Sequence, residues 1–144
     1  MTTIIVDTSA VIAVLLKEAT RPSIIKATQG VLLASPETLP FEVTNALSAR
    51  MKRSDEHRLS GTQASAAFAQ FRLMEIRLLP VNWQDHEQAL NLASQLGIYA
   101  YDAYLLVAAL NEKAALLTLD GMGRKPGLYQ QAERMGISVV NLRG

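Results

Sequence analysis

The sequence predicts an α/β fold with a central, mostly parallel sheet of about five strands and about seven helices. Apolar runs of four to six residues alternate with longer segments of helical periodicity, which is typical of parallel strands joined by crossover helices. The runs are mostly continuous in hydrophobicity, which indicates strands covered on both faces. The 144 residues, 49% of them hydrophobic, are enough for one compact domain over 1–144.

Short apolar segments define the expected strands. They lie at residues 3–6, 31–34, 76–81, 115–119 and 138–140. Helical periodicity places the helices at residues 10–17, 22–28, 40–53, 61–75, 84–96, 100–113 and 128–135. Local signals support several helix ends. Thr8 or Ser9 is a candidate cap for the first helix and Ser60 for the fourth, while Gly97 and Gly136 follow helices.

Four carboxylates lie in or beside apolar segments, where an isolated charge is costly to bury. Asp7 follows the first expected strand and Asp120 follows the fourth. Asp102 opens the apolar stretch 103–110, and Glu42 lies within the apolar segment 39–43. This pattern predicts a shared metal site.

The expected topology brings these acids together. In open parallel sheets, ligands bind outside the carboxyl ends of the strands, where Asp7 and Asp120 both lie. Glu42 and Asp102 lie near the starts of helices, where the helix dipole favours negative charge. We therefore expect the four carboxylates to converge at one edge of the sheet.

Polar neighbours of these acids are candidate supporting residues. Asn45 lies one helical turn after Glu42, and Thr8, Ser9 and Thr118 place hydroxyls next to the strand-end acids. We expect these side chains to orient ligands or water molecules.

Four ordered segments of this chain resemble the PIN-domain ribonucleases, and specifically the VapC-type toxins of bacterial toxin–antitoxin pairs. The segments are Ile5-Val6-Asp7-Thr8-Ser9-Ala10-Val11, Pro40-Phe41-Glu42-Val43-Thr44-Asn45-Ala46-Leu47, Tyr101-Asp102-Ala103-Tyr104-Leu105-Leu106-Val107-Ala108 and Leu117-Thr118-Leu119-Asp120. The resemblance runs essentially end to end and implies a PIN-like three-layer α/β/α sandwich. It also implies endonucleolytic cleavage of RNA, homodimers, and inhibition by a cognate VapB-type antitoxin.

The same resemblance implies a divalent metal held by Asp7, Glu42, Asp102 and Asp120. Hard oxygen ligands suit Mg²⁺ or Mn²⁺, and such a cation activates water and stabilises charge during phosphodiester hydrolysis. We expect Asp7 and Asp102 to be the principal ligands and Glu42 to be a ligand or a water-orienting base. Asp120 is expected to bind mostly through water.

Three further features have two interpretations each. Arg124 and Lys125 lie in a glycine-rich loop, residues 121–127, that departs from the family pattern; they either contact an RNA phosphate or are solvated. A basic run either steers RNA and meets an acidic antitoxin segment or follows from favourable charge at a helix end. It consists of Arg50, Lys52, Arg53 and Arg58. Trp83 is expected to pack at a helix start, with stacking on a base as the alternative.

Composition excludes several classes of protein. Without cysteines the chain has no disulfides, thiol nucleophile or cysteine-bound zinc, and this fits a reducing cytoplasm. A net charge of +1 argues against nucleic-acid binding by bulk charge. No signal peptide, membrane span, Walker loop, nucleophile elbow or dinucleotide-binding motif is visible, so a soluble cytoplasmic protein is expected.

Two other functions compete with the nuclease. A catalytically silent PIN-fold RNA-binding or regulatory module is the alternative on the same fold, and the intact Asp7, Glu42 and Asp102 argue against it. A flavodoxin-like phosphoacceptor domain would need an acidic pair after the first strand and an aspartate after the middle strand. The sequence has neither.

Overall fold

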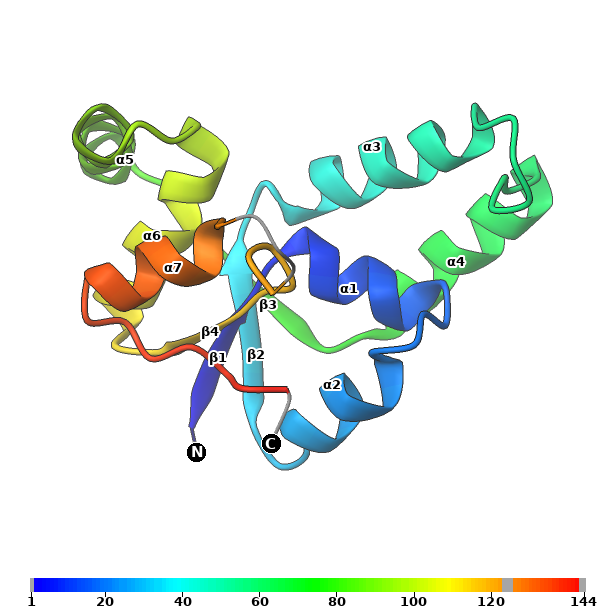
Figure 1. Cartoon of the computed structure of the whole chain (residues 1–144), viewed down its shortest axis with the longest axis horizontal. Coiled ribbons are helices and arrows are strands. Elements are labelled where there is room, and N and C mark those ends of the chain that lie inside the picture. Colours follow the sequence, from blue (N-terminus) through cyan, green and yellow to red (C-terminus); the bar gives the residue numbers. More distant parts are fainter. Residues whose placement is uncertain (1, 123–125, 143–144) are drawn as a thin grey trace.

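The computed structural model describes residues 2–122 and 126–142, in which parallel strands form one sheet between two layers of helices (Figure 1). The strands are β1 (Thr3–Val6), β2 (Leu32–Pro36), β3 (Ile76–Leu79) and β4 (Ala115–Leu117). Their spatial order is β3-β2-β1-β4. Ile4 of β1 is in register with Leu33 of β2 and Ala115 of β4. The predicted α/β class with a parallel sheet is confirmed.

Seven helices lie within the described residues, as the sequence predicted. They are α1 (Thr8–Leu15), α2 (Arg21–Ala27), α3 (Leu39–Met51), α4 (Gly61–Leu73), α5 (Trp83–Leu96), α6 (Ala100–Glu112) and α7 (Leu128–Arg134). Their ends differ from the predicted ends by at most two residues, as is usual for helix termini. Among the described residues, no helix has the length and apolar character needed to cross a bilayer.

Side chains of β1 alternate between the two faces of the sheet. Ile4 and Val6 pack into a core with α1 to α4, whereas Ile5 packs into a second core with α6 and α7. Each fully buried aliphatic side chain contributes about 1.5 to 3 kcal/mol relative to an exposed one. Burial on both faces explains why the strands read as continuous apolar runs, and it makes the fold a three-layer α/β/α sandwich.

The fifth expected strand, at residues 138–140, is reduced to an isolated parallel bridge between Leu116 and Val139. The backbone N–H of Leu116 donates to Ser138 and its carbonyl accepts from Val140, both at 2.9 Å. β4 is only three residues long, and its middle residue is the one that pairs with this segment. The sheet therefore has four strands in the described part of the chain rather than about five.

Helix caps agree with the sequence signals in part. Ser60 caps α4 through reciprocal hydrogen bonds with Gln63, and Gly97 ends α5 in the left-handed conformation at φ 66°. The predicted cap of α1 was wrong: α1 begins at Thr8, and the cap is the side chain of Asp7. Asp7 caps the helix instead of Thr8 or Ser9 because its backbone is extended, which directs its carboxylate toward the backbone N–H of Ala10.

Candidate functional site

The carboxyl ends of the strands lie between the helix pairs α3–α4 and α5–α6 (Figure 1). The order β3-β2-β1-β4 reverses direction beside β1, so the edge after β1 and β4 is the topological switch point of the sheet. Asp7 follows β1 there and Asp120 lies in the loop after β4. Glu42 lies in the first turn of α3 and Asp102 in the first turn of α6.

Asp7 is buried, with 6% of its surface exposed. Its Oδ1 accepts hydrogen bonds from Ser9 Oγ at 2.6 Å and from the backbone N–H of Ala10 at 3.1 Å. Its Oδ2 accepts from the hydroxyl of Thr118. Both oxygens therefore have donors within the fold, which fixes the orientation of the carboxylate.

Thr118 and Ser9 connect the end of β4 to the start of α1. The fully buried hydroxyl of Thr118 donates to Asp7 and accepts from the backbone N–H of Asp120 at 3.0 Å. Ser9 Oγ accepts from the backbone N–H of Leu119 at 3.1 Å. The bonds from Thr118 to Asp7 and from Leu119 to Ser9 join residues more than a hundred positions apart, so they fix the end of β4 and the start of its following loop relative to Asp7.

Glu42 is half-buried at the start of α3. Its Oε2 accepts from Thr38 Oγ1 at 3.0 Å, one turn earlier. Burial raises the pKa of Glu42, the hydroxyls of Thr38 and Thr8 oppose this rise, and the charges of Asp7 and Asp102 add to it. The acid on α3 therefore lies within electrostatic reach of the strand-end acid and of the acid on α6.

The four carboxylates, which we call the acidic cluster, act on one another. Burial is the main cause that raises the pKa of Asp7, with the charge of Asp120 adding to it, and hydrogen bonds from Ser9, Thr118 and Ala10 opposing it. Burial also raises the pKa of Asp102, to which the charges of Asp120 and Asp7 add. Four elements far apart in sequence thus bring like charges into one region.

Asp120 is the most exposed member of the acidic cluster and is tied to α7. Its Oδ2 accepts from the backbone N–H of Leu128 at 3.0 Å. A Cβ atom on Gly127 would lie 2.4 Å from Asp120 Oδ1, so this close approach requires glycine. Gly127 and the first residue of α7 therefore hold the carboxylate of Asp120 in place.

The donor set of the acidic cluster fits a hard divalent cation. It consists of carboxylate oxygens alone, which are the ligands that Mg²⁺ and Mn²⁺ prefer. Two carboxylates about 4 Å apart repel by roughly 4 kcal/mol at an effective dielectric constant near 20, and a cation removes that repulsion. Within residues 2–122 and 126–142, no three acidic or histidine side chains are already arranged around one metal position.

Three further expectations have different outcomes. Asn45 is exposed on α3 and its side chain makes no hydrogen bond to the described residues. Arg124 and Lys125, the expected phosphate contacts, lie outside the described residues. Trp83 does not pack at its helix start as predicted, because 82% of its surface is exposed.

The structure adds two positions that the sequence interpretation did not include. Thr38 binds Glu42, and Gly127 admits the carboxylate of Asp120. A hydroxyl four residues before a candidate acid on a helix is a usable signal for the first. The second depends on a contact across the loop, which no local pattern reveals.

Comparisons with known proteins identify the fold. A comparison with curated protein sequences gives no match. Among solved structures, VapBC2 from Rickettsia felis, bound to a DNA fragment from its promoter, has a TM-score of 0.66 at 15% identity, over 97% of this chain and 98% of that chain. FitAcB from Neisseria gonorrhoeae has a TM-score of 0.63 at 18% identity, over 97% of this chain and 98% of that chain.

A third similar structure is VapC20 from Mycobacterium tuberculosis, a sarcin–ricin-loop-cleaving toxin. It has a TM-score of 0.63 at 19% identity, over 82% of this chain and 90% of that chain. At these identities the likeness is one of fold. The model of the PIN domain matches residues 4–125, which is most of the chain, so this protein belongs to the PIN domain family.

Proposed function

We propose that this protein is a metal-dependent endoribonuclease that hydrolyses RNA phosphodiester bonds and acts as the toxin of a toxin–antitoxin pair. The observation that carries the proposal is the acidic cluster, in which four separate elements bring carboxylates into one electrostatically coupled site. Membership of the PIN domain family supports nuclease activity. The fold it shares with VapC20, a toxin that cleaves an RNA loop, supports RNA as the substrate.

Asp7, Glu42, Asp102 and Asp120 are the residues that would hold Mg²⁺ or Mn²⁺. The bound cation supplies charge neutralisation at the phosphate and lowers the pKa of a water molecule for attack. Ser9, Thr118 and the backbone N–H of Ala10 hold Asp7 in one orientation. The site therefore has at least one carboxylate positioned before substrate binds.

Thr38 orients the carboxylate of Glu42 through its hydroxyl. From this position Glu42 serves as a further oxygen ligand or orients the attacking water. Leu128 and Gly127 keep Asp120 at the open side of the site, where it contributes through water. Asp7, which is buried, is thus the ligand with a fixed orientation, and Asp120, which is exposed, is the ligand that adjusts its position.

The proposed partners follow from the same fold. VapBC2, VapBC-1 from nontypeable Haemophilus influenzae and a toxin–antitoxin complex from Klebsiella pneumoniae are among the solved structures that share this fold. We propose a VapB-type antitoxin that covers the acidic cluster, and a homodimer of the toxin.

The experiment that tests the function is cleavage of total cellular RNA by antitoxin-free protein, with Mg²⁺ or Mn²⁺ and with chelator. Wild type should yield discrete fragments with either metal and none with chelator. Asp7→Asn should reduce cleavage at least a thousandfold, because the buried anchor of the site loses its charge. Asp55→Asn is the matched control, since Asp55 is exposed and paired with Arg53 in the turn after α3.

A folded wild type that binds Mn²⁺ yet produces no fragments would support the catalytically silent RNA-binding module instead. Fragments that persist in Asp7→Asn would remove the acidic cluster from the mechanism. Circular dichroism of both variants separates loss of activity from loss of fold.

A further inference from the structure

Four aromatic side chains form a continuous line of rings across α5 and α6, which we call the aromatic strip. It consists of Trp83, His86, Tyr104 and Tyr101, with ring centroids of successive members 5.8, 5.3 and 6.4 Å apart. Nδ1 of His86 lies 2.5 Å from the hydroxyl of Tyr104. Trp83 is 82% exposed and Tyr101 60%. The strip thus presents two of its rings largely to solvent.

The fold does not account for this exposure. An aromatic side chain stabilises a protein mainly through the roughly 150 to 250 Å² of surface that it buries. Trp83 buries little of its surface, so it contributes little of this stabilisation. Trp83 is not needed to begin α5 either, because Asn82 and Asp85 cap the helix through reciprocal hydrogen bonds at 2.9 and 3.1 Å. An unburied tryptophan at a capped helix start points to a ligand.

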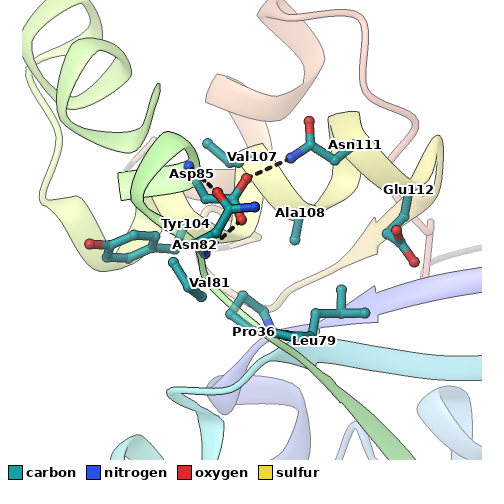
Figure 2. Close-up of a pocket in the computed structure, with 11 residues that line it drawn as sticks. Pro36, Leu79, Val81, Asn82, Asp85, Tyr104, Val107, Ala108, Asn111 and Glu112 are labelled. Atoms are coloured by element: carbon teal, nitrogen blue, oxygen red, sulfur yellow. Dashed lines mark hydrogen bonds between the residues drawn. The ribbon is translucent and has the colours of Figure 1, made fainter. Parts of the chain in front are cut away.

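The strip connects the acidic cluster to a cavity. Tyr101 directly precedes Asp102 in α6, so one end of the strip adjoins the site. Tyr104 lies at one end of a cavity of about 220 Å³ whose other end is Glu112 (Figure 2). Apolar side chains such as Leu79, Val81 and Val107 form its walls.

The polar lining of the cavity suits the edge of a nucleobase. Oδ1 of Asp85 accepts from Nδ2 of Asn111 at 3.1 Å, which orients both side chains (Figure 2). Nδ2 of Asn82 and Oδ1 of Asn111 have no hydrogen-bond partner among the described residues, so one donor and one acceptor remain for a ligand. Cavities for drug-sized ligands measure about 300 to 1,000 Å³, so this one suits something smaller. A single base has the required size, flat apolar faces and polar edge.

We propose that the aromatic strip stacks on bases of single-stranded RNA beside the cleaved phosphodiester, and that the cavity receives one of them. The proposal rests on the nuclease function proposed above and assigns base recognition to α5 and α6. Sequence-specific binding of RNA generally uses unstacked bases on aromatic side chains, with hydrogen bonds to their edges. No lysine or arginine belongs to the strip, and Arg77 at the far end of the cavity is paired with Glu112. The strip therefore recognises base faces rather than phosphates.

Trp83 is the only tryptophan of the chain, so its fluorescence reports on the strip directly. The probe is a 12-nucleotide single-stranded RNA containing all four bases, titrated into Asp7→Asn protein so that no cleavage occurs. The RNA should quench Trp83 emission, and a sugar–phosphate oligomer of equal length without bases should not. Trp83→Ala and Tyr101→Ala, measured by filter binding in the same background, should each weaken affinity roughly 5- to 100-fold.

Two controls separate stacking from other effects. Trp83→Phe keeps a ring and should retain most of the affinity. Leu90→Ala removes an apolar side chain of α5 that is also largely exposed, at 68%, and should change nothing. The slope of log affinity against log salt should stay the same in Trp83→Ala, because stacking releases no counterions.

Equal binding of the base-free oligomer, or absence of Trp83 quenching, would overturn the proposal. So would strip variants that lower the mass of the protein in sedimentation equilibrium while leaving RNA affinity unchanged, since the strip would then be a contact between copies of this chain. Wild-type cleavage is measured separately. Cleavage by wild type without quenching of Trp83 overturns only the proposed role of the aromatic strip. Quenching of Trp83 without cleavage by wild type overturns only the proposed nuclease function.

Discussion

The acidic cluster and the basic run are two concentrations of charge in this protein, and they differ in how their charges are compensated. Arg50 pairs with Glu18 at 2.9 Å and Arg53 with Asp55 at 2.5 Å, both near the end of α3 and partly or largely exposed. The acidic cluster instead gathers like charges around a buried Asp7. The carboxylate of Asp7 accepts hydrogen bonds from the hydroxyls of Ser9 and Thr118, whereas Asp55 and Glu18 are paired with arginines.

This difference separates a structural use of charge from a functional one. Opposite charges at the surface contribute little and require nothing further. Like charges in a partly buried site carry a repulsion that a bound proton or cation would relieve. The pairing in the basic run also favours its structural interpretation over steering of RNA for Arg50 and Arg53.

The largest effect that we expect to distinguish the two regions is stabilisation of the folded protein by divalent cations. Mg²⁺ or Mn²⁺ at about 100 times its dissociation constant should raise the free energy of unfolding of wild type by about 2.7 kcal/mol. Thermal unfolding with and without cation measures it. Asp55→Asn should respond like wild type, and Asp7→Asn should lose most of the response. Equal stabilisation of both variants would place the cation outside the acidic cluster.

A second prediction concerns Thr118, which acts through Asp7 as a positioning residue. Thr118→Val keeps the shape of the side chain but removes the hydroxyl, so Mn²⁺ affinity and cleavage rate should each fall about 10- to 100-fold. Thr118→Ser restores the hydroxyl and should recover most of both. Failure of serine to rescue would show that packing, not the hydrogen bond, is the role of Thr118.

The two regions should also respond to pH in opposite directions when metal is absent. The pKa values of Asp7, Glu42 and Asp102 are raised in the folded state, so that state binds more protons than the unfolded one above about pH 4. Their contribution to stability is therefore greatest in acid and is lost as pH rises through the folded pKa values. Urea unfolding in chelator between pH 4 and 7 measures this fall, which Asp7→Asn should flatten.

For Asp55 the sign is reversed. Hydrogen bonds and charge from Arg53 lower the pKa of Asp55, so its contribution is present above its unfolded pKa and is lost as pH falls through the folded value. Asp55→Asn should therefore leave the neutral-pH fall of wild type intact. A flattened profile in this variant would contradict the separation of the two regions.

The smallest expected effect belongs to Arg50. Arg50→Gln removes a partly exposed ion pair with Glu18 and should lower the free energy of unfolding by about 0.2 to 1 kcal/mol. RNA cleavage should stay at the wild-type rate, because this guanidinium is already paired. If Arg50→Gln lost cleavage but kept normal metal affinity, the result would indicate that Arg50 binds RNA.

Local sequence signals predicted those elements whose cause is local. The strand at 3–6 and the start of α6 at Ala100 were predicted correctly, because a run of aliphatic residues and a helical periodicity are properties of neighbouring residues. The fifth strand was not predicted correctly, since pairing at 138–140 depends on how far β4 extends. Likewise Asp7, rather than Thr8 or Ser9, caps α1, because competition between adjacent caps depends on backbone geometry.

By itself, the sequence determined the α/β class, the four acids and their places at the ends of strands and starts of helices, because each follows from composition and short-range pattern. Only the tertiary structure decided what surrounds them. The bond from Thr118 to Asp7, the bond from the backbone N–H of Leu119 to Ser9 and the exposure of Trp83 join or separate residues distant in the chain. Such contacts arise from packing of whole elements, so no local pattern encodes them.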